Sequence, residues 1–265
     1  MIPAIRSEFR KFFTTRLWWG MAIAVFVSAA AFAALTGVLI ANPSAGGPGG
    51  GQVIGNDTQV ANSIYTAGTS IGRLLLLTIG ILAIGGEFRH KTISATLLAT
   101  PRRARAMLAK AAALSGIGAL YGLLGIVGSA LVGAIVLRVI DRPVFPSAEI
   151  GRTLLLSLLV LALWALIGLG IGILIPNQVA ALFIGVAVAW IVEPLVGLLL
   201  GIWAFSREHV APFLPTNATN ATFNAISQSA DEVRLEWWGG ALTLAAYAVA
   251  LAGFGIWRTT RADIS

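Results

Sequence analysis

The sequence predicts an all-α membrane protein with six transmembrane helices. Of its 265 residues, 57% are hydrophobic and only 11% are charged, less than half of the roughly 25% charge content typical of soluble domains. The apolar residues also form continuous runs of about 20 residues or more, which is the length that a helix needs to cross about 30 Å of hydrocarbon. Strands of a membrane barrel would instead alternate polar and apolar residues in segments of about ten.

A single transmembrane domain is expected to fill residues 1–265. The apolar runs predict spans over residues 17–41, 64–86, 111–137, 152–175, 179–205 and 237–257. The stretch from Asn42 to Asn62 is rich in Gly, Ser, Asn and Pro, so we expect a flexible outer loop there. Only a tight turn fits between the fourth and fifth spans, which leaves residues 87–110 as the one sizeable loop on the inner side.

The placement of the basic residues predicts the orientation. Lys and Arg accumulate on the cytoplasmic side of short loops, and 12 of the 18 fall on that side when both termini are cytoplasmic. The formal net charge of +7 therefore indicates topology and contact with anionic inner-leaflet lipid, with no nucleic acid as a partner. We expect a multi-pass protein of a bacterial cytoplasmic membrane.

Residues 1–16 are expected to form an amphipathic helix lying on the inner leaflet. Phe9, Phe12 and Phe13 share one helical face with the apolar residues before them, whereas Arg10 lies mostly elsewhere. A second interpretation stays open, in which this segment only anchors the topology of the first span.

The inner loop is expected to contain a short amphipathic helix that ends near Pro101, because proline lacks an amide donor and disfavours helix before it. Such a helix is suited to docking in a groove of a partner protein. The alternative is that the basic residues of the loop only set the topology and contact anionic lipid.

The inner loop carries a resemblance to a known family. The run Gly86-Glu87-Phe88-Arg89-His90-Lys91-Thr92, followed by Thr96-Leu97-Leu98, Pro101-Arg102-Arg103 and Lys110, resembles the six-helix permeases of the type-2 ABC exporter family. The order of elements is similar across nearly the whole chain.

This resemblance implies a permease subunit that works with two copies of an ABC ATPase subunit and with a second permease copy or a related permease. It also implies a re-entrant outer element before the last span, to which residues 194–205 are expected to contribute. The residues expected to contact the ATPase subunit are Glu87, Phe88, Arg89, His90, Lys91, Thr92, Thr96, Leu97, Pro101, Arg102 and Arg103 of the loop, with Phe9, Arg10, Phe12 and Phe13 of the interfacial helix.

ATP hydrolysis is expected on a separate subunit. The segment from Gly85 to Thr92 superficially looks like a phosphate-binding loop, but that motif needs Gly directly before the Lys, and His90 stands there. We therefore expect no cofactor on this chain, with ATP and Mg on the partner. No metal site is expected either, since the two histidines do not have zinc-ligand spacing.

Two charged residues lie well inside the predicted spans, away from their ends. Arg73 and Glu193 are expected at depths that an arginine side chain can bridge, so we predict that they pair, because an unpaired charge is expensive in hydrocarbon. Pro194 removes the amide donor that the Trp190 carbonyl needs, so the fifth span is expected to kink or break there. Arg73 is either a structural lock or part of a substrate path.

The sequence therefore favours an exporter permease that moves a small molecule, drug, lipid or peptide by alternating access. One alternative is a membrane-embedded sensor or immunity partner with permease architecture. An intramembrane enzyme is a further alternative, although it would need converging polar residues at one depth, and the sequence offers only Arg73 and Glu193.

Overall fold

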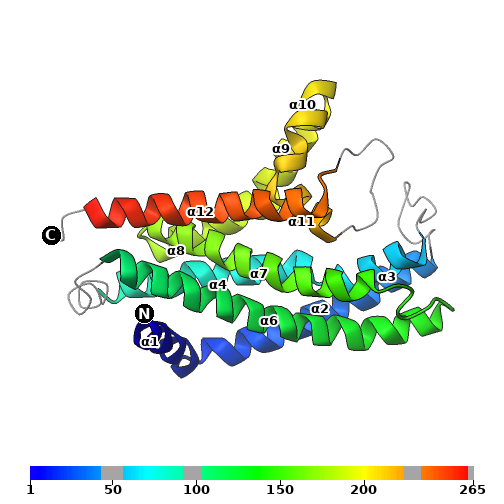
Figure 1. Cartoon of the computed structure of the whole chain (residues 1–265), viewed down its shortest axis with the longest axis horizontal. Helices are drawn as coiled ribbons and strands as arrows, with labels where there is room; N and C mark the ends of the chain where they lie inside the picture. Colours follow the sequence, from blue (N-terminus) through cyan, green and yellow to red (C-terminus); the bar gives the residue numbers. More distant parts are fainter. Residues whose placement is uncertain (43–55, 92–102, 224–233, 262–265) are drawn as a thin grey trace.

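The computed structural model describes residues 1–42, 56–91, 103–223 and 234–261 (Figure 1). Across these ranges the regular structure is helical, and six helices are long and apolar enough to cross a membrane. The predictions of an all-helical structure and of six helices long and apolar enough to cross a membrane are thereby confirmed. The candidate spans are Leu17–Ala41, Asp57–Arg89, Arg105–Val139, Glu149–Leu174, Gln178–Gly201 and Trp237–Gly255.

The helices are arranged roughly side by side, with both chain termini at one end of the bundle (Figure 1). We call this the termini end and the opposite one the loop end. Helix α1 (Ile2–Thr14) lies at the termini end and is followed after two residues by α2 (Leu17–Ala41). Helix α1 packs mainly against α6 (Arg103–Val139), which runs the length of the bundle.

The second span is built from two helices, α3 (Asp57–Thr66) and α4 (Thr69–Arg89). The expectation of a loop up to Asn62 is therefore wrong over its last residues. A capping box starts the helix: the Asn56 side chain accepts a hydrogen bond from the Gln59 amide at 2.9 Å, and the Gln59 side chain accepts one from the Asn56 amide at 3.1 Å. These two bonds satisfy amides that a helix start leaves without partners.

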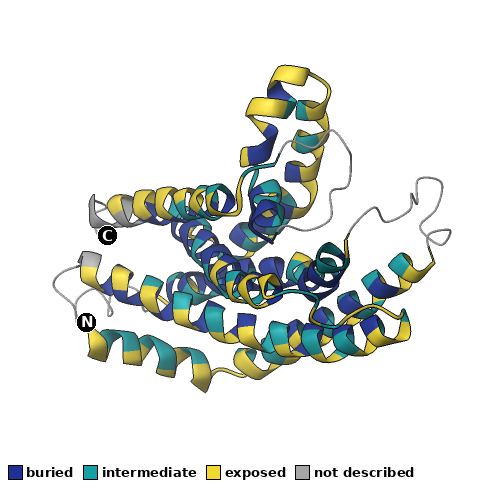
Figure 2. Ribbon diagram, turned by 45° about the vertical axis from the view of Figure 1, so that its right-hand side comes forward, coloured by how far each residue is buried: buried dark blue, intermediate teal, exposed yellow. Residues whose placement is uncertain are grey.

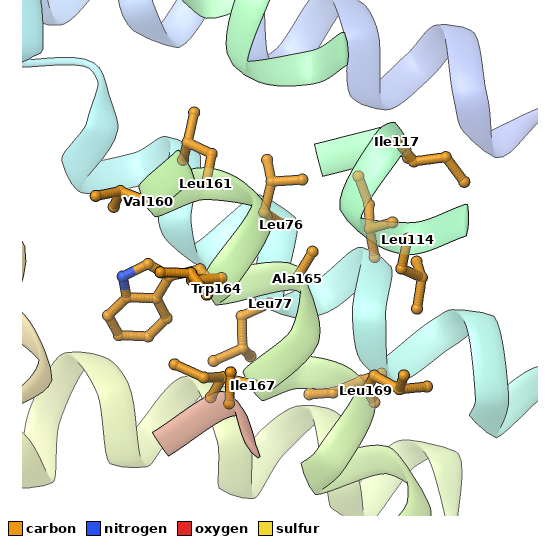
Figure 3. Close-up of a cluster of buried hydrophobic side chains, with 14 of the residues drawn as sticks. Leu76, Leu77, Leu114, Ile117, Val160, Leu161, Trp164, Ala165, Ile167 and Leu169 are labelled. Atoms are coloured by element: carbon orange, nitrogen blue, oxygen red, sulfur yellow. The ribbon is translucent and has the colours of Figure 1, made fainter. Parts of the chain in front are cut away.

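The core lies where α4 and α6 pack against α7 (Glu149–Leu174) (Figure 3). Leu76 and Leu77 of α4 meet Trp164 of α7 there, and all three are almost fully buried. The closest approach of α4 and α7 depends on glycine: a Cβ on Gly80 would lie 2.1 Å from the Ala165 carbonyl oxygen. Close backbone approach through small residues is how helices associate tightly in lipid.

The fifth span bends away from the bundle. It consists of α8 (Gln178–Ala187), a π-helical turn η2 (Val188–Val192) and α9 (Glu193–Gly201), and it continues into α10 (Ala204–His209). Figure 1 shows α9 and α10 projecting from the bundle, and Figure 2 shows that their surface is largely exposed. The exposed side chains are mostly apolar, as lipid-facing residues are.

The chain then returns to the loop end of the bundle. The short helix η3 (Ala211–Phe213) leads into α11 (Pro215–Phe223), which packs against α7 and α12. Helix α12 (Trp237–Arg261) runs back to the termini end along α7. Helix α11 is the element that positions several polar side chains described below.

Candidate functional site

Four charged side chains meet at the termini end, and we call them the four-charge cluster: Glu8, Lys11, Glu87 and Lys110. Lys110 contacts both Glu8 and Glu87, with Nζ 3.0 Å from Glu87 Oε1. Lys11 also contacts both carboxylates, with Nζ 2.7 Å from Glu8 Oε1 and 2.9 Å from Glu87 Oε1. Two cations and two anions cancel in charge, which lowers the cost of burying Glu8, Glu87 and Lys110.

The cluster joins three helices. Glu8 and Lys11 are three residues apart on α1 and so project from the same face, Glu87 belongs to the last turn of α4, and Lys110 lies near the start of α6. The side chain of Lys110 is only 4% exposed and that of Glu87 10%, whereas Lys11 is 46% exposed. The ion pairs of Lys110 are therefore the shielded ones, and those of Lys11 lie at the molecular surface.

Glu8 and Lys11, the two members of the cluster on α1, are each stabilised in the charged form. Burial raises the pKa of the Glu8 carboxyl, but the charges and hydrogen bonds of Lys110 and Lys11 outweigh it, so the pKa is lowered overall. Burial lowers the pKa of Lys11, and its hydrogen bonds to Glu8 and Glu87 reverse that effect, so this pKa is raised overall. Both shifts mean that the cluster stabilises the folded protein while it is ionised.

A cavity of about 360 Å³ lies beside the cluster, between α1, α4 and α6. Apart from the charged groups, its walls are mostly apolar side chains such as Ile79 and Leu114. Glu87 lines it and is the least satisfied member of the cluster: its Oε2 is buried without a hydrogen-bond partner in the described part of the chain. The four-charge cluster thus holds α1, α4 and α6 together beside a cavity that their side chains do not fill.

The residues predicted to contact a partner divide into three groups. Glu87 points inward to the cluster and Phe88 packs against the core, whereas Arg89, His90 and Lys91 are exposed at the end of α4. Thr92, Thr96, Leu97, Pro101 and Arg102 lie outside the described residues, and of Arg103 only the helical backbone is described.

The predicted contact residues of α1 are likewise partly packed against the core and partly exposed. Phe9 and Phe12 pack against the core, and Phe12 meets the ring of Tyr121 edge-on at 5.9 Å between centroids. Phe13 is 38% exposed and Arg10 is exposed. The predicted apolar face thus serves mainly to dock α1 on α6, with its edge at the molecular surface.

Deeper in the bundle, Arg73 and Glu193 are both buried, at 9% and 7% exposed. Nη1 of Arg73 donates to Thr216 Oγ1 at 2.8 Å, and the backbone amide of Thr216 donates to Glu193 Oε1. The guanidinium lies 5.4 Å from the ring centroid of Trp164, whose indole donates to Thr219 Oγ1 at 3.0 Å.

The two charges are neighbours, as the sequence predicts, but they do not form the direct ion pair that we expected. Thr216 of α11 stands between them and bonds to both. A hydroxyl can accept from a cation while a backbone amide donates to an anion, so Thr216 offsets part of the cost of burying both charges. The Nε of Arg73 is buried without a hydrogen-bond partner among the described residues.

The predicted distortion of the fifth span takes the form of the π turn η2. Because Pro194 has no amide hydrogen, the helix cannot continue its regular hydrogen bonding there, and the Glu193 amide instead bonds to the Val188 carbonyl five residues back. The turn immediately precedes the buried carboxylate of Glu193. Distorted helix and buried charge thus coincide.

No protein-family model and no curated protein matches this chain. Within the described residues there is no group of three or more His, Cys, Asp or Glu side chains close enough to hold a metal ion.

Sequence reasoning missed Glu8, Lys11 and Thr216 as partners. The three-residue spacing of Glu8 and Lys11 is a signal for a helical ion pair, but nothing local predicts their contacts with Glu87 and Lys110, which are distant in the chain. Thr216 lies in a segment of small polar residues that has no charge or motif to mark it.

Proposed function

We propose that this chain is the membrane-spanning permease subunit of an ATP-driven exporter. It would lie in a bacterial cytoplasmic membrane with both termini cytoplasmic, and it would move a small molecule, drug, lipid or peptide outward. The observation that best supports this is the four-charge cluster, which fastens α1 to the ends of both α4 and α6.

The cluster would transmit movement of a partner subunit to the helix bundle. A partner that pushes on the termini end reaches α1 and the exposed end of α4 first. Because Lys110 is shielded and bonded to carboxylates of both helices, displacement of α1 or α4 is passed on to α6, which runs the length of the bundle. Packed interfaces respond to such a push by switching between discrete arrangements, and the cavity beside the cluster leaves room for it.

The docking surface for the ATPase subunits is Arg89, His90 and Lys91 at the end of α4, continued by the inner loop and by the exposed edge of α1 near Arg10 and Phe13. ATP and Mg would be bound by the two partner subunits. Helix α1 lies on the inner leaflet in this proposal, where its basic residues contact anionic lipid.

We also propose roles for two further parts of the chain. The re-entrant outer element was expected to include residues 194–205, but α9 of the fifth span takes up 194–201. We propose instead that α10, η3 and α11 form this element, since the chain leaves the bundle after the fifth span and returns to pack on α7 and α12. The exposed apolar surface of α8 and α9, with Phe183 and Leu198 more than 70% exposed, provides area for lipid or for a second permease copy.

Site-specific cross-linking tests the proposal. A photoreactive residue at Arg89 is introduced into the full chain, which is co-expressed with ABC ATPase subunits from the same genome. The same residue at Phe145, which is 65% exposed at the loop end, is the comparison. We expect an adduct with the ATPase from position 89 and none from position 145. Equal labelling from both positions, or no complex in mild detergent, would contradict the proposal.

A further inference from the structure

A second cavity, of about 400 Å³, lies at the loop end, between α3, α7, α11 and the start of α12. Its floor includes three buried polar residues, and its rim carries charged and aromatic ones. The floor residues are Asn62, Thr153 and Thr222, and the rim residues are Glu149, Arg152, Arg234, Glu236 and Trp237. The volume lies in the range of roughly 300–1,000 Å³ that is usual for small-ligand sites.

Asn62 is the unusual member of this cavity. It is 1% exposed, yet neither its Nδ2 nor its Oδ1 has a hydrogen-bond partner among the described residues. Its backbone carbonyl accepts a hydrogen bond from Thr66 Oγ1, so the helix around it is otherwise well satisfied. A buried carboxamide that makes no hydrogen bond through either its nitrogen or its oxygen destabilises a folded protein. Such a residue in a native structure therefore needs an explanation.

The rim offers charges of both signs. Glu149 and Arg152 lie three residues apart on α7, and Arg234 and Glu236 lie just before α12. The Arg152 guanidinium is held 4.2 Å from the ring centroid of Trp237, which fixes it at the opening. A ligand that enters therefore meets charges of both signs before it reaches the carboxamide on the floor.

We propose that this cavity binds a short zwitterionic peptide. In an extended peptide, the N–H and C=O of one residue belong to adjacent peptide units and point to the same side, so they can pair with the Oδ1 and Nδ2 of Asn62. The free amino and carboxyl termini match the glutamates and arginines of the rim. A phospholipid headgroup fits less well, because it has no N–H and C=O pointing to the same side to pair with the carboxamide of Asn62.

The site lies at the opposite end of the bundle from the four-charge cluster, and binding to it does not depend on the proposed export function. The test uses the full chain alone in phosphatidylcholine nanodiscs, titrated with triglycine by calorimetry. We expect saturable binding. N-Acetyl-triglycine amide, which keeps the peptide units but lacks both charges, is expected to bind more weakly.

The decisive variant is Asn62→Leu. Because it removes the orphaned groups, its thermal midpoint should stay equal or rise, whereas triglycine affinity should fall about tenfold or more. The matched control is Thr66→Val, which is one turn away on α3, equally buried and not part of the cavity wall. Its affinity should be unchanged. Should Asn62→Leu fail to fold, Arg152→Gln on the exposed rim takes its place, with a loss of about fivefold or more expected.

Three results would overturn the proposal. The first is no saturable heat with triglycine at millimolar concentrations. The second is a variant, Asn62→Leu or its substitute Arg152→Gln, that binds triglycine with the same affinity as the wild-type chain. The third is stabilisation by phosphatidylethanolamine in the disc that depends on Asn62 while triglycine has no effect, which would assign the cavity to a lipid headgroup.

Discussion

Replacing Lys110 with Met removes the shielded cation of the four-charge cluster while keeping the length of the side chain. Glu8 and Glu87 then share only Lys11, which is 46% exposed. Removing one partner of a buried ion pair costs about 3–5 kcal/mol, because the remaining charge stays buried without its partner. Since Lys11 remains bonded to both carboxylates, we expect the lower end, about 3 kcal/mol.

The assay is thermal unfolding followed by tryptophan fluorescence in detergent. At about 2–4 °C per kcal/mol for a chain of this size, the midpoint should fall by roughly 6–12 °C. Arg105→Met is the matched control, since Arg105 lies five residues earlier on the same helix but is exposed. Its midpoint should change by less than roughly 2 °C.

A double-mutant cycle of Lys110→Met with Glu8→Gln separates this contact from general damage. Side chains in direct contact show non-additive effects of about 0.5–3 kcal/mol, and here the double variant should be less damaged than the sum of the two single variants. Strict additivity, or a midpoint for Lys110→Met no lower than that of the control, would refute the inference that Lys110 binds α1 to α6.

Three further changes test other parts of the chain. Because the pKa of Glu8 is lowered from 4.5, its contribution is full above about pH 4.5 and is lost as the pH falls through the lowered value, so the midpoints of Glu8→Gln and wild type should converge only in that acidic range. Exchanging Arg73 and Glu193 should leave the double variant as unstable as the worse single one, since an Arg at position 193 would face the donating amide of Thr216; recovery of the wild-type midpoint would instead indicate a direct pair. Pro194→Ala restores an amide donor and should straighten the fifth span, so spin labels on α8 and α10 in this cysteine-free chain should move apart; an unchanged distance would mean that packing sets the bend.

The spans were predictable because lipid leaves few options: long apolar runs must be helical and about 20 residues long. The first span is reproduced at Leu17–Ala41. The start of the second span was not predicted correctly, because the region before it was interpreted as a flexible loop. The Asn56–Gln59 capping box is a local sequence signal for a helix start that this interpretation overlooked. The bend at Pro194 followed from the missing amide, a purely local cause.

The side-chain contacts between spans were harder to predict from the sequence. The depths of Arg73 and Glu193 follow from helix rise, so their proximity was predictable, but the rotation of α11 that places Thr216 between them was not. The same holds for Asn62, which looks like an ordinary loop polar residue until packing buries it. Side-chain partners across a bundle depend on helix rotation and tilt, which packing decides and hydropathy does not record.

The two cavities are connected by rigid elements. Helix α4 carries Arg73 and Glu87 about 21 Å apart, counting 14 residues at 1.5 Å each, and α11 carries both Thr216 and the cavity residue Thr222. The four-charge cluster and the loop-end cavity are energetically coupled only if changes at both sites shift the same equilibrium between two arrangements of the bundle. If they do, breaking the cluster with Lys110→Met should change triglycine affinity at the loop end by about fivefold or more, and Arg105→Met should not. Equal affinity in all three proteins would show that the two ends act independently.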